Sequence, residues 1–137
     1  MAYKFSETSK KHLSEAHIDL QILFHEVIKF IDCSVLVGYR NEVDQNLFFG
    51  TGKSEKRYPE SKHNKIPSMA VDVAPYPINW DDLKRFYYFG GVVKGIAKML
   101  LEKKYISHEI RWGGDWDGDN DLNDQNFNDL VHFELIS

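Results

Sequence analysis

The sequence has a single cysteine and no long hydrophobic run, and each shortage excludes a class of protein. Cys33 has no partner for an intramolecular disulfide or a cysteine-rich metal knuckle, so we expect it to be an inert buried residue and any metal ligands to be histidines and carboxylates. No stretch approaches the roughly 18 apolar residues of a membrane span, so we expect no membrane partner. A hydrophobic content of 42% without low-complexity tracts is typical of an ordinary globular protein.

An excess of positive charge is also missing. Seventeen basic residues against 21 acidic ones give a net charge of -4, which argues against nucleic acid as a partner, since nucleic-acid binding usually needs a basic surface. The charge is unevenly placed: basic residues collect between 53 and 65, whereas residues 115–129 carry six aspartates and no base.

The N-terminus lacks a signal-peptide apolar region, so we expect the protein to remain in the cytoplasm in which it is made.

Apolar periodicity predicts one α+β domain over residues 1–137. The helical spacing of apolar residues predicts helices at 18–31 and from an Asn79 N-cap to about 104, and a short helix within 41–65. Short β-branched, apolar runs predict four strands, at 33–39, 69–78, 107–112 and 130–136. This order predicts a small, mainly antiparallel sheet with helices packed against it. Three glycines weaken the long helix by about 1 kcal/mol each, which predicts close packing or a kink at Gly90, Gly91 and Gly95.

The candidate chemistry begins with His63 and Asp72 in the stretch SKHNKIPSMAVDVAP, residues 61–75. A catalytic zinc typically has three protein ligands from His, Asp or Glu, with water in the fourth position. His132 lies in a predicted strand whose alternation puts it on one face with Glu134, and Asp129 precedes it by three residues. Asp129 and His132 can therefore present a ligand and a nearby base to one site. Spacing alone also fits a plain loop histidine and a strand-edge charge, and we expect the four other histidines to be ordinary surface or boundary residues: His12, His17, His25 and His108.

Four sequence blocks resemble those of the zinc peptidases of the D-Ala-D-Ala carboxypeptidase type. In chain order they are GYR, SKHNKIPSMAVDVAPY, RWGGDWDGD and DLVHFEL. They are most similar to the L-alanyl-D-glutamate peptidases that bacteriophages use as endolysins, and the resemblance covers about residues 6–136. It implies zinc ligands at His63, Asp72 and His132. It also implies a general base or acid at Asp129, a substrate-carbonyl contact at Arg40 and a pocket-lining role for Ser61.

The sequence departs from the common family form at one place. That form has six residues, including a Gly, between the first His and the Asp, whereas this chain has eight, NKIPSMAV, with no Gly. Because Asp72 still lies within a predicted strand, we expect the ligand to be kept and the loop to bulge.

The resemblance implies hydrolysis of peptidoglycan stem peptides between L-Ala and D-Glu by a monomeric phage endolysin without a separate wall-binding domain. Such an enzyme would stay in the host cytoplasm until lysis and then act on the wall from the periplasm. Two alternatives stay open: cleavage of a D-Ala-D-Ala terminus, and a zinc-bearing wall-binding module that cuts nothing. Asp129 argues against the module, because a site that only binds needs no base beside its metal.

The acidic stretch DWDGDNDLND, residues 115–124, suggests a second metal. Its spacing follows the first half of a calcium-binding EF-hand loop, with Asn120 where Gly normally makes the sharp turn and Asn126 where the bidentate Glu should be. The alternative is a solvated acidic turn, or a family loop in which Asp115 and Trp116 wall the substrate groove. The candidate calcium ligands are Asp115, Asp117, Asp119, Asp121 and Asp124.

Overall fold

A four-stranded antiparallel sheet in the order β1-β2-β4-β3 organises the chain. The structure, a computed structural model, describes residues 3–123 and 129–136. Its elements are α1 (Glu7–Ser14), α2 (Ile18–Val27), β1 (Cys33–Val37), α3 (Glu42–Gly50), the 3-10 helix η1 (Lys62–Asn64), β2 (Ala70–Pro75), α4 (Leu83–Glu102), β3 (Glu109–Gly113) and β4 (Asp129–Ile136). The expected α+β class is confirmed.

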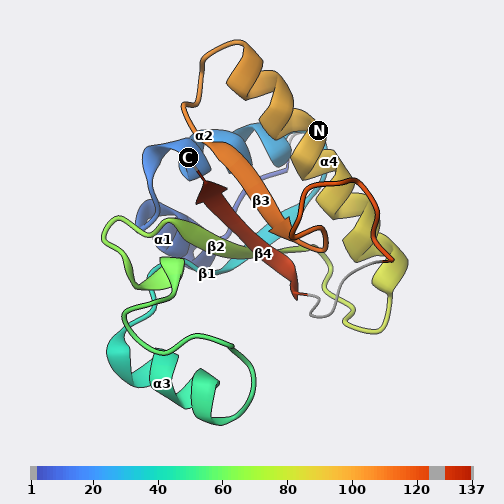
Figure 1. Ribbon diagram of the computed structural model, residues 1–137. Coiled ribbons are helices and arrows are strands. Elements are labelled where there is room, and N and C mark those ends of the chain that lie inside the picture. The colour runs from blue at the N-terminus through green and yellow to red at the C-terminus, as the bar shows by residue number, and fades with distance from the viewer. Residues whose placement is uncertain (1–2, 124–128, 137) are drawn as a thin grey trace.

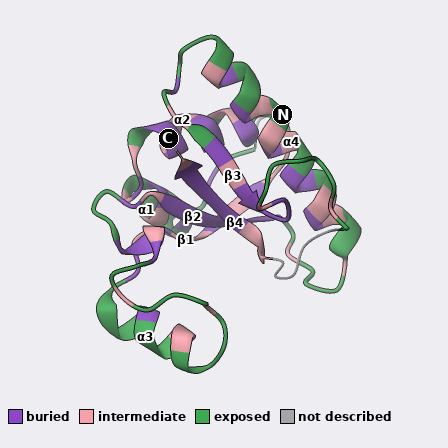
Figure 2. Ribbon diagram, in the orientation of Figure 1, coloured by how far each residue is buried: buried purple, intermediate pink, exposed green. Residues whose placement is uncertain are grey.

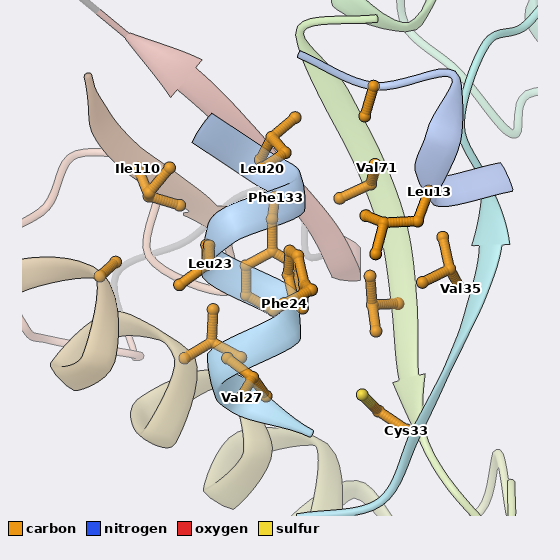
Figure 3. Packing of buried hydrophobic residues seen from close by; sticks show 14 of the residues in the cluster. Leu13, Leu20, Leu23, Phe24, Val27, Cys33, Val35, Val71, Ile110 and Phe133 are labelled. Atoms are coloured by element: carbon orange, nitrogen blue, oxygen red, sulfur yellow. The ribbon is translucent and has the colours of Figure 1, made fainter. Parts of the chain in front are cut away.

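One face of the sheet carries the hydrophobic core. Figure 1 shows α1, α2 and α4 on one side of the sheet, with α3 set apart from it at the bottom of the view. In Figure 3, Leu20, Leu23, Phe24 and Val27 project from α2 towards Phe133 of β4, and the Phe24 and Phe133 rings meet edge to face at 5.4 Å. Cys33 lies in this core, where burial and nearby Asp32 raise its pKa to about 12, so it is the inert thiol that we expected.

Because side chains alternate along each strand, the polar side chains of β2 and β4 lie on the sheet face opposite the core. Side chains of successive strand residues point to opposite faces of a sheet. The core takes Val71, Val73, Phe133 and Leu135, all fully buried. The residues between them, Asp72, His132 and Glu134, therefore share the other face, where β2 and β4 pair Asp72 with His132.

Several element ends differ from the sequence-based expectation. The first core helix stops at Val27 rather than 31, and α4 begins at Leu83 rather than directly after Asn79. Asn79 does cap, but it caps a tight turn: its side-chain oxygen accepts the backbone N–H of Asp81, and Trp80 stacks on Phe86. Of the helices within residues 3–123 and 129–136, none is both long and apolar enough to cross a bilayer.

The lobe formed by α3 and the following residues to 60 is mostly exposed, as Figure 2 shows for α3. Gln45 is its buried anchor: its side chain accepts from Arg40 and donates to Ser54 and to the carbonyl of Lys56. The lobe is thus held to the sheet by polar contacts rather than by a second hydrophobic core.

The three glycines of α4 have different roles. A Cβ at Gly90 would overlap the indole ring of Trp112, whereas a Cβ at Gly91 or Gly95 would meet no atom within 4 Å. The Trp112 ring cannot easily retreat, because it stacks on Phe133 and its Nε1 donates to the Leu130 carbonyl. Close packing is therefore confirmed at Gly90 alone.

We predict opposite stability effects for two neighbouring substitutions. Gly90→Ala should lower the free energy of unfolding by about 1–3 kcal/mol, because it overpacks the Trp112 contact. Gly91→Ala should raise it by about 1 kcal/mol, because alanine is the better helix former and has free space there. Urea denaturation of both variants measures the difference, and equal effects would contradict the packing described.

Candidate metal centre

The structure brings His63, Asp72 and His132 together on the open face of the sheet. His63 Nε2 lies 3.1 Å from Asp72 Oδ1 and 3.3 Å from His132 Nδ1, and His132 Nδ1 lies 3.4 Å from the same carboxylate oxygen. Tetrahedral zinc ligands with bonds of about 2.0–2.2 Å lie roughly 3.3–3.5 Å apart. The three atoms therefore already have nearly the mutual spacing that one zinc ion requires.

The second nitrogen of each imidazole is held by an acceptor. His63 Nδ1 lies 2.9 Å from the carbonyl oxygen of Gly38, to which it must donate, and His132 Nε2 lies 2.8 Å from Glu134 Oε1. Such partners fix the tautomer and ring orientation of metal-binding histidines. They leave His63 Nε2 and His132 Nδ1 as the ligand atoms, which are the two that face Asp72.

The connection between the two expected ligands takes up its extra length without moving either of them. Ser61 caps η1 by accepting the backbone N–H of His63, and the loop then packs back against α1, where Ser68 donates to the Glu15 carbonyl. Asp72 stays in the middle of β2. The expectation of a bulging loop with a retained Asp72 therefore fits the structure.

Charge at the centre is strongly unbalanced without a cation. Burial alone would raise the pKa of Asp72, but His63 and His132 hold it well below its usual range. Burial would lower the pKa of His132, yet its hydrogen bonds with Asp72 and Glu134 raise it to about 9. Because a histidine must be unprotonated at the nitrogen that binds a metal, zinc binding to His132 would release a proton.

Arg40 and Asp129 lie beside the three donor atoms. Arg40 Nη2 is 3.4 Å from Asp72 Oδ2, its Nη1 donates to Gln45, and its guanidinium lies over the Phe48 ring. Among the described residues, its ion-pair partner is Asp72 and not an acidic residue at the start of α3. Asp129 Oδ2 is 4.0 Å from His132 Nδ1, close to the centre without joining the ligand triangle.

Unlike Asp72 and Glu134, Asp129 has a pKa above its ordinary value. Burial and the negative charge of Asp72 raise its pKa, and nearby cations only partly offset this. A carboxylate whose pKa is moved towards neutrality is suited to accept and return a proton. Its position depends on Gly113, since a Cβ there would overlap the Asp129 backbone carbonyl.

A pocket of about 720 Å³ surrounds these groups. Ser61 and Trp116 line it, and the Trp116 ring centroid lies 5.4 Å from that of His132. Asp115 lines a neighbouring groove instead, so its expected role in the substrate pocket stays a prediction.

The acidic turn places Asp115, Asp117 and Asp119 with carboxylate oxygens within 4.8 Å of one another. Asn120 has a φ of 65°, the left-handed conformation expected at the sharp turn of a calcium loop. The Asp121 side chain instead accepts the Asn123 backbone N–H, and Asp124 lies outside the described residues.

A further group, His17, Asp19 and His108, could also hold a metal, but its atoms already have structural bonds. Asp19 Oδ2 accepts from Ser107 and His108, and His17 Nδ1 caps α2 by accepting the Asp19 backbone N–H. These contacts join the start of α2 to the start of β3.

The sequence reasoning missed the residues that orient the centre. Glu134 was placed on the right face but not recognised as the partner of His132, and Arg111 and Lys62 pair with Glu134 in turn. Burial would raise the pKa of Glu134, but its bonds to His132 and Arg111 lower it to about 2. The His-x-Glu alternation in β4 could have indicated the role of Glu134, whereas nothing in the sequence indicated the roles of Gly38 and Gly113.

The fold and the family agree with the geometry. The L-Ala D-Glu endopeptidase ChiX of Serratia marcescens has a similar structure, with a TM-score of 0.72, 22% sequence identity, and coverage of 97% of this chain and 90% of that chain. At this identity the likeness shows the fold alone. No curated protein matches the sequence. The family described as phage L-alanyl-D-glutamate peptidase matches residues 1–136, which confirms the resemblance read from the four sequence blocks. The chain therefore belongs to the phage L-alanyl-D-glutamate peptidase family.

Proposed function

We propose that the chain is a zinc-dependent endopeptidase that cuts peptidoglycan stem peptides between L-Ala and D-Glu. The observation that carries the proposal is the triangle of His63 Nε2, Asp72 Oδ1 and His132 Nδ1, with Asp129 beside it. Two imidazoles and one carboxylate are a common catalytic zinc set. Family membership supports the choice of bond.

Zinc held by this set would act as a Lewis acid and lower the pKa of a water towards about 7. Asp129, 4.0 Å from His132, is placed to accept a proton from the attacking water and return it to the leaving amine. The buried guanidinium of Arg40 is placed to stabilise negative charge on the carbonyl oxygen. Glu134 holds His132 in orientation, and its lowered pKa makes it a poor proton acceptor.

Family membership also supports a role as a phage endolysin. We propose that the protein remains in the host cytoplasm until lysis and then reaches the wall from the periplasmic side. Cleavage of a D-Ala-D-Ala terminus uses the same ligand set and remains the alternative activity.

The first prediction concerns both zinc binding and the identity of the peptide bond that is cut. His63→Ala, Asp72→Ala and His132→Ala should each lose zinc and activity, because each removes one corner of the donor triangle. Metal analysis per chain and mass spectrometry of digested peptidoglycan measure the two effects, and the wild-type digest should contain new D-Glu N-termini. His25→Ala, an exposed histidine on α2, is the control that should keep both. Release of terminal D-Ala instead would establish the alternative activity.

The second prediction tests whether Asp129 acts as a general base rather than as a zinc ligand. Asp129→Asn should keep zinc and the free energy of unfolding while turnover falls by about 10²-fold or more, the usual contribution of a general base. The readouts are kcat on a defined muropeptide, metal content and a urea denaturation curve. Turnover within twofold of wild type would assign the base elsewhere.

The third prediction concerns the shape of the Arg40 side chain. Arg40→Lys should reduce kcat by about tenfold or more with zinc retained, because lysine keeps the charge but loses the planar fork that reaches Asp72 and Gln45 together. Arg57→Lys is the matched control, since Arg57 also lies over a phenylalanine of α3, Phe49, but outside the metal pocket. Equal losses in both variants would point to lobe stability rather than to chemistry.

The fourth prediction concerns the acidic turn, for which we propose calcium binding. Asp115 Oδ1 is buried and has no hydrogen-bond partner within residues 3–123 and 129–136, and burial and the neighbouring aspartates raise the pKa of this carboxyl. A calcium ion would satisfy that oxygen and the like charges around it. Calorimetry on the zinc-loaded protein should give micromolar to millimolar affinity, which Asp117→Ala with Asp119→Ala abolishes. The paired control Asp81→Ala with Asp82→Ala, before α4, should leave binding unchanged, and absence of heat in the wild type would exclude the site.

A further inference from the structure

A second groove, of about 790 Å³, adjoins the metal pocket. It runs between α4, β3 and the acidic turn, and Figure 1 shows these three segments side by side. Three of its lining residues, Arg111, Trp116 and Asp117, also line the metal pocket. The two hollows therefore adjoin at these residues.

Two glycines form part of the groove wall without any packing reason. Gly91 and Gly95 are exposed on α4, and a Cβ at either position would meet nothing within 4 Å. Each costs the helix about 1 kcal/mol relative to alanine. Gly90 differs, because Trp112 fills the space beside it. The bare surface at Gly91 and Gly95 therefore has value only for something outside the protein's own core.

The chemistry of the groove suits a neutral ligand rich in hydroxyl groups. Three basic and three acidic side chains line it and balance in charge: Lys94, Lys98, Arg111, Glu109, Asp115 and Asp117. Tyr87 and Trp116 add aromatic surface, which is large, apolar and flat. Asp115 is 2% exposed, and its Oδ1 accepts no hydrogen bond among the described residues, so in calcium-free protein a ligand beside it should bring a donor.

We propose that this groove binds the glycan strand of peptidoglycan at the sugar that carries the stem peptide. The inference rests on the proposed function. L-Ala is joined to that sugar through the lactyl group of the sugar, and one residue spans at most about 3.3–3.6 Å, so a bond cut after L-Ala must lie within roughly 7 Å of the sugar ring. The α4 groove adjoins the metal pocket, so it lies at the distance from the cut bond at which the sugar is expected. A D-Ala-D-Ala bond lies roughly 10 Å further along the peptide and needs no such groove.

The kinetic test compares two substrates with the same stem peptide, one attached to its disaccharide and one free. Wild-type kcat/KM should favour the sugar-bearing substrate by about tenfold or more, since remote binding energy is used at the reacting bond. In Gly95→Trp, which fills the groove, this ratio should fall towards one. Met99→Trp places the same side chain one turn further along α4, outside the groove, and should keep the wild-type ratio. Equal use of both substrates by the wild type, or equal ratios in the two variants, would overturn the proposal.

A binding test separates this inference from the proposed function. The peptide-free disaccharide is titrated by NMR into metal-free protein in chelator, where neither zinc nor calcium contributes. Shifts should follow Gly91, Gly95 and Trp116, and Gly95→Trp should remove them while Met99→Trp does not. If the wild type cuts neither substrate but binds the disaccharide in this way, the reaction is wrong and the groove assignment stands. Shifts produced by the free stem peptide alone would assign the groove to peptide and refute the glycan proposal.

Discussion

The pairing of Asp72 with His132 across β2 and β4 is the constraint on which the rest of the site depends. Antiparallel register decides which side chains share a face, and a slip by one residue reverses the faces. In the observed register Val71 and Phe133 enter the core, and the two polar side chains meet on the other face. The hydrophobic core therefore positions the ligands: the same alternation that buries Phe133 under α2 presents His132 to Asp72.

The three carboxylates of the centre differ in how strongly a nearby cation compensates their charge. Asp72 has Arg40 within 3.4 Å, and Glu134 has Arg111 within 2.7 Å, so both stay ionised and fixed in place. Asp129 has no comparable cation among the contacts of the described residues, and its raised pKa follows from that and from burial beside Asp72. A group held ionised by a strong partner is a poor base at neutral pH, whereas a less compensated one exchanges protons readily. The electrostatics thus support the proposed division of roles among three neighbouring acids, with Asp72 as ligand, Glu134 as orienting residue and Asp129 as base.

The sequence predicted the strands and the clustering of His63, Asp72 and His132, because both follow from local patterns and motifs. Alternation in β4 placed His132 correctly, and motif resemblance named His63 across an atypical loop. Helix ends were less predictable: Asn79 looked like the cap of α4, but tertiary stacking of Trp80 on Phe86 uses it in a separate turn. The role of Gly113 could not be foreseen, since it depends on how closely β3 approaches Asp129, a contact between strands rather than a property of either sequence.

Which peptide bond such a site cuts depends on the space available to the substrate on either side of the metal. A carboxypeptidase needs one closed end with a cation for the terminal carboxylate, whereas an endopeptidase needs chain to continue both ways. Here the metal pocket reaches Lys53 and Lys56 of the α3 lobe on one side and adjoins the α4 groove at Trp116 on the other. The lobe is held by polar contacts through Gln45, and the groove is lined by α4 and β3. A substrate that crosses the centre would therefore meet a helix and a strand of the main fold on the groove side and a separately held polar lobe on the other side. This asymmetry suits a uniform glycan at the first and a variable stem peptide at the second.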